Sequence, residues 1–253
     1  MKIKKLSPKQ VIISLTALIL VGVLVASLFW FGVVKFNNPS RKTYPVRGVD
    51  VSVYQGDIDW KILADQNIDF AFIKATEGSS FVDPNFLLNF ENAIKTDLRV
   101  GAYHFFSFDS GGDTQAQNFI DTVYPCDNML PPVVDFEYYG KYVKEPPTDK
   151  EAVRHELSVM LDMLEAHYGI KPIIYATTES YEYLLADHFD GYDLWIRSVY
   201  SKPPKEYDGK WTFWQYTNRQ RLDGYDGEET YIDMNVFYGT KEEFGEYGKK
   251  GKN

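Results

Sequence analysis

The sequence predicts one α/β domain whose strands close into a barrel, and three observations support this. Apolar strand-like runs alternate with helix-like runs between residues 47 and 240, which is typical of a parallel sheet covered by helices. These runs include eight strands, the number that closes such a barrel. The first strand is not followed by a glycine-rich phosphate loop, which the main rival, an open doubly wound sheet, usually carries.

The predicted strands are short runs rich in β-branched and aromatic residues. They span residues 48–54, 70–75, 99–106, 133–137, 172–176, 194–198, 211–216 and 231–237. Five helical patterns follow the first five strands, at residues 58–66, 84–96 with Asp83 as the N-cap, 114–123, 149–168 closed by Gly169, and 180–188. The stretches between the last three strands are too short or too rich in Pro and Gly for full helices. We therefore expect a TIM-like barrel whose ring of helices is incomplete on one side.

The amino terminus predicts a membrane segment. Residues 1–10 contain four lysines and no acid, and residues 11–34 contain no charged side chain. This run exceeds the about 20 residues that a membrane-spanning helix needs, and it continues past the small residues Ala26 and Ser27, where a signal peptidase would cut. We expect an uncleaved anchor with residues 1–10 in the cytoplasm and the domain outside it, and secretion after cleavage is the alternative.

Polar segments flank the predicted domain. Residues 35–46 are expected to form a short linker, and residues 241–253 a frayed polar tail, which assigns the domain to residues 47–240. After residue 42 the chain has 20 basic and 36 acidic residues, and this balance argues against nucleic acid as a ligand. The single cysteine, Cys126, excludes an internal disulfide and a cysteine-based metal site.

Four acidic side chains are predicted to point into the mouth of the barrel. Asp135 and Glu137 are two residues apart at the end of a strand, so both project from the same face. Asp50 and Asp233 alternate with apolar residues in the first and last strands, which are neighbours in a closed barrel. Two neighbouring carboxylates repel, so one is expected to keep its proton at a higher pH than a free acid, as general-acid chemistry requires.

These acids also have structural explanations. Glu137 is then a solvated residue at the exit of its strand, and Asp50 and Asp233 are ion-paired to Lys74 or Arg197. Four acids from three strands, with few matching cations, favour a carboxylate site. Other chemistry has little support, because the chain has no Gly-x-Ser-x-Gly motif and no helix with a two-histidine metal spacing. His104 is expected to be a hydrogen-bonded core residue.

Aromatic side chains, 16% of the sequence, occupy several predicted strand ends. Flat aromatic faces pack well against the apolar faces of sugar rings, and tyrosine hydroxyls add hydrogen bonds. Each of these residues, taken singly, is more typical of a core than of a binding site. The candidates for carbohydrate binding are Tyr103, Tyr175, Trp195, Trp214 and Tyr216.

Six short motifs follow one another along the predicted domain. They are Gly-Val-Asp-Val-Ser at 48–52, Phe-Ile-Lys-Ala-Thr-Glu-Gly at 72–78, Gly-Ala-Tyr-His-Phe at 101–105, Val-Asp-Phe-Glu at 134–137, Leu-Trp-Ile at 194–196 and Trp-Gln-Tyr at 214–216. Together they resemble the motifs of the glycoside hydrolase family 25 lysozymes, over residues 47–237. The resemblance implies a (β/α)5(β)3 barrel that works without a metal or another cofactor.

The resemblance also implies an activity, cleavage of the β-1,4 bond between N-acetylmuramic acid and N-acetylglucosamine in the glycan strands of peptidoglycan. Glu137 would be the general acid that protonates the leaving oxygen, and Asp135 would orient the substrate's own acetamido group, whose carbonyl attacks the anomeric carbon. Asp50 and Asp233 would tune this pair, and Tyr103 would contact the acetamido group.

The chain departs from the family pattern in two places. Arg197 and Ser198 follow the Leu-Trp-Ile motif where an alanine and a polar residue are expected, so the substrate site is predicted to differ there. No cell-wall-binding repeats follow the domain, and the anchor is expected to keep the enzyme near its polymer. A catalytically silent glycan-binding barrel and a chitinase-like glycosidase are the alternatives. Retention of all four acids favours catalysis, because a lectin needs no protonated carboxyl.

Overall fold

The chain divides into two compact units, and the division falls between Phe36 and Asn37. The computed structural model describes residues 7–207 and 209–249, so most of the predicted leader lies outside the described residues. In the first unit, α1 (Pro8–Trp30) begins with a capping box between Ser7 and Gln10. By length and composition, this helix is able to cross a membrane.

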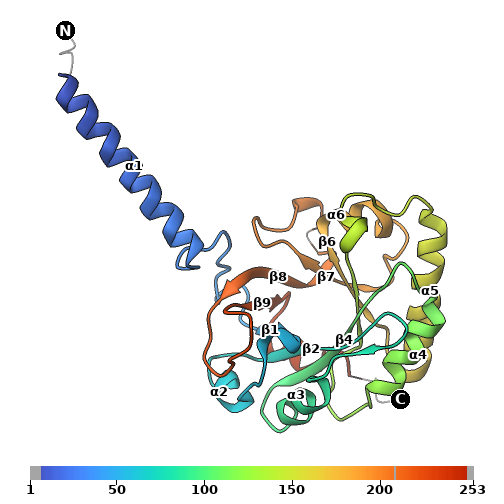
Figure 1. The fold of residues 1–253 in the computed structure, drawn as a ribbon. Helices are drawn as coiled ribbons and strands as arrows, with labels where there is room; N and C mark the ends of the chain where they lie inside the picture. The colour runs from blue at the N-terminus through green and yellow to red at the C-terminus, as the bar shows by residue number, and fades with distance from the viewer. Residues whose placement is uncertain (1–6, 208, 250–253) are drawn as a thin grey trace. The chain divides into compact units, whose positions relative to one another are not determined.

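The second unit contains the predicted closed barrel of eight strands (Figure 1). Its strands are β1 (Arg47–Val51), β2 (Phe70–Glu77), β4 (Arg99–Phe105), β5 (Val133–Phe136), β6 (Ile173–Thr177), β7 (Asp193–Arg197), β8 (Trp211–Gln220) and β9 (Ile232–Phe237). The order around the barrel is β1-β9-β8-β7-β6-β5-β4-β2, and pairing of β1 with β2 closes it. The two-residue strand β3 (Phe81–Val82) adds to β2 in antiparallel orientation.

One strand runs against the expected direction. β9 pairs antiparallel with both β1 and β8, whereas the alternating pattern predicted a parallel sheet throughout. The loop of residues 221–231 joins β8 to β9 without a helix, and an antiparallel pair needs no helical crossover. The start of β9, and not its end, therefore lies at the mouth of the barrel. This places Asp233 in register with Asp50 on β1.

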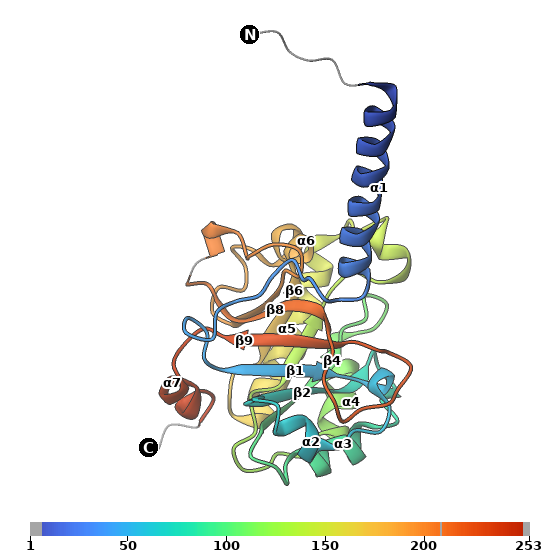
Figure 2. The same ribbon diagram turned by 90° about the vertical axis from the view of Figure 1, so that its left-hand side faces the viewer.

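The helices follow the first strands, as predicted, and leave part of the barrel uncovered. They are α2 (Trp60–Ala64), α3 (Phe86–Ala93), α4 (Gly112–Thr122), α5 (Lys150–Tyr168) and α6 (Thr178–Ser180), which continues into a π-helical turn at Tyr181–Leu185. Short 3-10 turns lie at Val53–Gln55, Gly140–Val143 and Lys205–Tyr207. α5 ends at Gly169, whose positive φ of 67° closes the helix as expected. Figure 2 looks onto the uncovered side, where β8, β9 and β1 lie side by side.

Aromatic rings fill the barrel below its mouth. The rings of Phe72 and Trp195 stack with centroids 4.7 Å apart, and Phe70 packs edge-on against Phe72 at 5.7 Å. Glycines on the neighbouring strands make this possible, because a Cβ at Gly48 would lie 2.3 Å from the Phe70 ring and one at Gly101 2.5 Å from the Phe72 ring. These rings form a rigid apolar floor under the polar mouth.

The expectation of a frayed tail is wrong for its first part, because Lys241–Glu246 forms helix α7. Phe244 is only 5% exposed and packs on Phe70 and Phe237. The Tyr247 hydroxyl donates to Asp193 at 2.7 Å. The prediction considered the shortage of aliphatic residues, but burial of the tail's aromatic rings supplies the apolar area. Residues 250–253 lie outside the described part of the chain.

The predicted linker is also packed onto the barrel from Asn37 onward. The Asn37 amide is 6% exposed and donates to the backbone carbonyls of Ser198, Ser201 and Tyr216, at 2.9, 2.9 and 3.2 Å. A buried amide with three acceptors is a fixed point of attachment. The folded domain therefore begins about ten residues before the boundary expected from the sequence.

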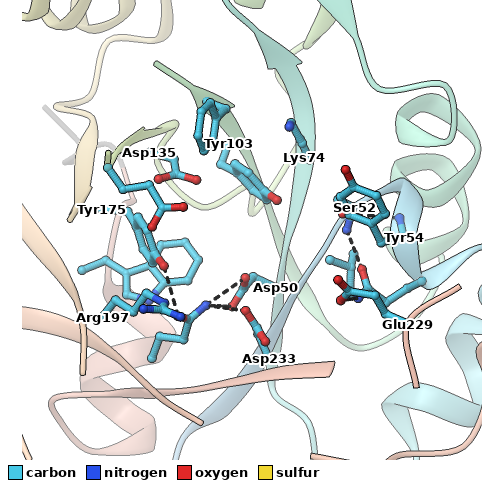
Figure 3. Close-up of a pocket in the computed structure, with 16 residues that line it drawn as sticks. Asp50, Ser52, Tyr54, Lys74, Tyr103, Asp135, Tyr175, Arg197, Glu229 and Asp233 are labelled. Carbon is cyan, nitrogen blue, oxygen red and sulfur yellow. Dashed lines mark hydrogen bonds between the residues drawn. The ribbon is translucent and has the colours of Figure 1, made fainter. Parts of the chain in front are cut away.

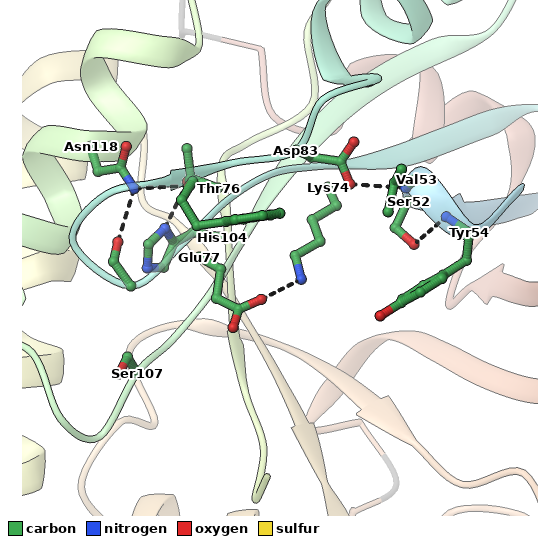
Figure 4. Close-up of polar contacts among 12 residues, drawn as sticks. Ser52, Val53, Tyr54, Lys74, Thr76, Glu77, Asp83, His104, Ser107 and Asn118 are labelled. Atoms are coloured by element: carbon green, nitrogen blue, oxygen red, sulfur yellow. Dashed lines mark hydrogen bonds and ion pairs between the residues drawn. The ribbon is translucent and has the colours of Figure 1, made fainter. Parts of the chain in front are cut away.

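His104 on β4 is a buried, hydrogen-bonded residue, as expected. Its Nδ1 lies 2.7 Å from Thr76 Oγ1 (Figure 4), and its Nε2 lies 3.1 Å from Gln115 Oε1. The Gln115 amide nitrogen donates to two backbone carbonyls, so Oε1 is the acceptor and His104 donates to it from Nε2. Burial lowers the pKa of His104 to about 4. The ring is therefore neutral at pH 7.

We expect His104 to make the fold less stable in acid. Its pKa is about 4 when folded against 6.5 for the free side chain, so the unfolded state binds the proton more readily between these values. This contribution to stability is complete above pH 6.5 and is lost as the pH falls toward 4. Urea unfolding at pH 7 and pH 4.5 should therefore show a larger loss for the parent than for His104→Gln. Equal losses would contradict the assignment.

Candidate active site

A cavity of about 280 Å³ opens at the mouth of the barrel (Figure 3). All four predicted catalytic acids line it, together with a fifth acid from the loop before β9. These are Asp50, Asp135, Glu137, Asp233 and Glu229. The strand alternation thus brings together side chains that are up to 183 positions apart in the sequence. Two cations, Lys74 and Arg197, also line the cavity.

Gln215 on β8 allows Asp50 and Asp233 to lie close together. Its amide nitrogen donates to both Asp50 oxygens, at 3.1 and 3.0 Å, and to Asp233 Oδ2 at 2.8 Å. Its amide oxygen accepts from the Tyr175 hydroxyl at 3.0 Å, which fixes the orientation of the amide. Tyr175, a predicted substrate-binding residue, therefore also orients Gln215, whose amide binds Asp50 and Asp233.

A second amide supports Asp50 from the neighbouring strand. Asn235 Nδ2 donates to Asp50 Oδ2 at 2.6 Å, and Asn235 Oδ1 accepts from Trp195 Nε1 at 2.8 Å. Trp195 thus lines the cavity and orients Asn235 at the same time. Both acids of this pair thus accept their side-chain hydrogen bonds from neutral amides.

The ion-pair explanation of Asp50 and Asp233 is not supported. Lys74 pairs instead with Glu77, at 2.7 Å (Figure 4). Within the described residues, neither Asp50 nor Asp233 has a cation within ion-pair distance. Burial raises the pKa of Asp50, and burial together with the charge of Asp50 raises the pKa of Asp233 well above its ordinary value. The pair therefore keeps a proton to higher pH than free carboxyls do.

Asp135 and Glu137 form the second pair of acids. Asp135 lies on β5 next to its last residue, and its side chain lines the cavity. The residue is 9% exposed. Burial raises its pKa well above the ordinary value, the charge of Glu137 raises it further, and Lys74 opposes both effects. Burial also raises the pKa of Glu137, against the opposing charge of Arg197. Glu137 is thus a half-buried residue of the cavity and not a solvated residue at a strand exit, and both carboxyls keep a proton to higher pH than free acids do.

The predicted aromatic residues divide into two groups. Tyr103, Tyr175 and Trp195 line the cavity. Trp214 does not, because it is 1% exposed on the outer face of β8, where its Nε1 donates to the Ser198 carbonyl at 3.0 Å. Alternation along β8 explains the difference, since Gln215 next to it points inward.

Several cavity residues were missed as site residues by the sequence reasoning, among them Gln215, Tyr54 and Glu229. Gln215 lies in the Trp-Gln-Tyr motif, where a polar residue between two aromatic residues indicates a side chain that points into the barrel. Tyr54 lies at the rim with 53% exposure. Glu229 is brought in by the loop before β9, where its backbone N–H donates to the Tyr54 carbonyl at 3.1 Å and its carboxylate accepts from Gln55 at 3.2 Å. A contact between two such distant loops has no local sequence signal.

Asp83 braces this rim and is not the N-cap predicted for the next helix. The N-cap position of α3 is Asn85, whereas the Asp83 carboxylate accepts from the backbone N–H groups of Val53 and Asn85, both at 2.9 Å (Figure 4). A buried carboxylate that accepts two backbone N–H groups fixes the loop after β1. This loop carries Tyr54 to the cavity.

A closed α/β barrel with two pairs of carboxyls gathered in one cavity at its mouth identifies the chain as a glycoside hydrolase. Residues 49–225 match the profile of glycosyl hydrolases family 25. The chain belongs to this family.

Known relatives agree with this assignment. A family 25 glycosyl hydrolase of Bacillus anthracis has a solved structure with 56% identity and a TM-score of 0.80, covering 85% of this chain and 98% of that one. The YegX protein of Escherichia coli strain K12 is 37% identical over 206 residues, 79% of this chain and 72% of the relative. Lysozyme M1 of Streptomyces globisporus is 31% identical over 208 residues, 78% of this chain and 69% of the relative.

Proposed function

We propose that this protein is an N-acetylmuramidase that cleaves the β-1,4 bond between N-acetylmuramic acid and N-acetylglucosamine in peptidoglycan. The observation that carries the proposal is that Asp135 and Glu137, both with a raised pKa, lie in one cavity lined by aromatic side chains. The similarity to Lysozyme M1 and to an N,O-diacetylmuramidase of Arthroderma benhamiae, which is 24% identical over 214 residues, supports this substrate.

In the proposed mechanism, substrate binding decides which carboxyl of the pair holds the proton. Of the two, the pKa of Asp135 is raised further in the free protein. The acetamido N–H of the bound muramyl ring donates to Asp135, which stabilises its ionised form. The negative charge then present on Asp135 favours the neutral form of Glu137. The proton thereby passes from Asp135 to Glu137, the general acid.

Bond cleavage then proceeds in two steps. Glu137 gives its proton to the glycosidic oxygen of the leaving N-acetylglucosamine, while the acetamido carbonyl oxygen attacks the anomeric carbon and forms a cyclic oxazolinium. In the second step, the Glu137 carboxylate takes a proton from water as that water opens the ring at the anomeric carbon. The configuration is retained, and Glu137 is neutral again.

Other cavity residues position the substrate and set the local charge. Tyr103 lies beside the acids in Figure 3 and contacts the acetamido group in this proposal. Asp50 and Asp233, held by Gln215, keep the local potential negative and so stabilise the positive charge that develops at the anomeric carbon.

We further propose that α1 remains attached and anchors the enzyme in a membrane, with the catalytic domain outside the cytoplasm. The apolar run of this helix is longer than the core of a signal peptide, and four lysines precede it. Secretion after cleavage is the alternative, and it predicts a mature protein that lacks α1.

Product analysis tests the proposed activity. Purified peptidoglycan is digested, the new reducing ends are reduced with borohydride, and the fragments are identified by mass spectrometry. We expect the reduced sugar to be muramic acid. Reduced glucosamine, or faster cleavage of chitin oligomers, would point to the chitinase-like alternative. No new reducing ends from either polymer would favour the silent glycan-binding barrel.

A further inference from the structure

Arg197 is a cation in the mouth of the barrel, at the position where the sequence analysis expects the substrate site to differ from the family pattern. It ends β7, where it lies in register with Thr177 on β6 and Gln215 on β8. It is half-buried and lines the cavity. In Figure 3 it lies next to Tyr175, across the cavity from Tyr54 and Glu229.

The charges around Arg197 are unbalanced. Five acids and two cations line the cavity, and the other cation, Lys74, is already paired with Glu77 at 2.7 Å. The Arg197 guanidinium forms no hydrogen bond or ion pair with any residue that the structure describes, although its charge opposes the rise in the pKa of Glu137 and Asp233. A half-buried guanidinium with its donors available is suited to bind an anion from outside the protein.

We propose that Arg197 binds a carboxylate carried on O3 of the muramic acid residue, and that it thereby selects muramic acid over N-acetylglucosamine at the cleaved bond. This inference rests on the proposed muramidase function. The two sugars differ only at O3, where muramic acid carries a lactyl ether. A cavity with five acids repels an added carboxylate, so recognition of one requires a local cation. The planar fork of arginine matches a carboxylate with two parallel hydrogen bonds.

Two groups on the substrate offer this chemistry. In a glycan strand without peptide, the lactyl group itself ends in a free carboxylate. In a strand that carries a stem peptide, the lactyl carbonyl is an amide, and the carboxylate comes from an acidic residue of the stem. The test therefore needs three glycans of equal length: bare, bare with its carboxyls converted to methylamides, and stem-bearing.

Arg197→Gln is the test variant, measured as kcat/KM on the three glycans at one pH. We expect a loss of roughly 10- to 100-fold on carboxylate-bearing glycan, as for a charge-assisted hydrogen bond. On the methylamide glycan we expect less than about a threefold change. A selective loss on the bare glycan identifies the lactyl carboxylate, and a selective loss on the stem-bearing glycan identifies the stem. Loss of Arg197 also raises the pKa of Glu137, but this changes kcat/KM on all three glycans alike. It therefore cancels when the loss on one glycan is divided by the loss on another.

Two further variants separate recognition from a general effect of charge. Arg197→Lys keeps the charge without the planar fork, so we expect it to recover part of the selectivity. Lys74→Gln removes the paired cation of the same cavity, and we expect it to change the rates on all three glycans by the same factor. Binding of the bare glycan, measured by calorimetry in the Glu137→Gln background, should weaken when Arg197→Gln is added.

An equal loss on all three glycans with unchanged binding would overturn the inference and leave Arg197 as a counter-charge for Glu137. This result is distinct from failure of the proposed function. If the parent released no muramic acid reducing ends, the muramidase proposal itself would fail before Arg197 was tested.

Discussion

Glu137→Gln is expected to lower kcat on peptidoglycan by roughly 100- to 10,000-fold, the usual contribution of a general acid. The amide has nearly the shape of the carboxyl but cannot give a proton to the leaving oxygen. Because half-buried Glu137 repels Asp135 when both are ionised, the change should not weaken the fold. Release of reducing sugar from purified peptidoglycan measures the activity, and thermal unfolding monitors the fold.

Glu151→Gln is the matched control for this change. Glu151 lies in the first turn of α5, where its exposed carboxylate pairs with Arg154 at 2.7 Å. The same chemical substitution there should alter activity by less than about twofold, because exposed pairs contribute little. Parental activity in Glu137→Gln would refute the assignment of the acid.

Asp135→Asn is expected to lower kcat by roughly 100- to 1,000-fold and, at the same time, to stabilise the protein by about 1–2 kcal/mol at neutral pH. The activity falls because a neutral amide does not polarise the acetamido group. The stability rises because a buried carboxylate next to Glu137 is costly when ionised. An activity and a stability that change in opposite directions are typical of a residue kept for function.

The stabilisation by Asp135→Asn is expected to depend on pH. The folded pKa of Asp135 lies well above the ordinary value of 3.8, so its contribution to stability is complete below pH 3.8 and is lost as the pH rises through the folded pKa. Asp135→Asn should therefore gain more over the parent at pH 8 than at pH 5, in denaturant unfolding at both values. A variant less stable than the parent at pH 8 would show that the carboxylate is a structural partner.

Much of the fold and site could be predicted because it depends on local patterns. Side chains of a barrel strand point alternately outward, under the helices, and into the barrel. The valines beside Asp50 and the apolar neighbours of Asp233 therefore indicated that both carboxyls point inward. The spacing of Asp135 and Glu137 worked in the same way. Closure of eight strands then brought these residues into one cavity.

The missed features depend on contacts between distant segments. The direction of β9 is set by a loop without a helix, and Glu229 enters the site because that loop packs on Tyr54. The order of α7 depends on a pocket for Phe244 formed by residues far away in sequence. Trp214 is the wrong choice of substrate-binding residue because a position near a strand end does not say which face a side chain occupies, and neighbouring residues lie on opposite faces.

The most direct test of proton donation by Glu137 compares two substrates of Glu137→Gln. One is the natural muramyl glycan, whose sugar leaving group needs a proton, and the other is an N-acetylmuramyl glycoside with a nitrophenolate leaving group, which needs none. We expect the variant to lose roughly 100-fold or more on the glycan but less than about tenfold in the bond-cleaving step on the nitrophenyl glycoside. An equal loss on both substrates would contradict the role of Glu137 as the acid.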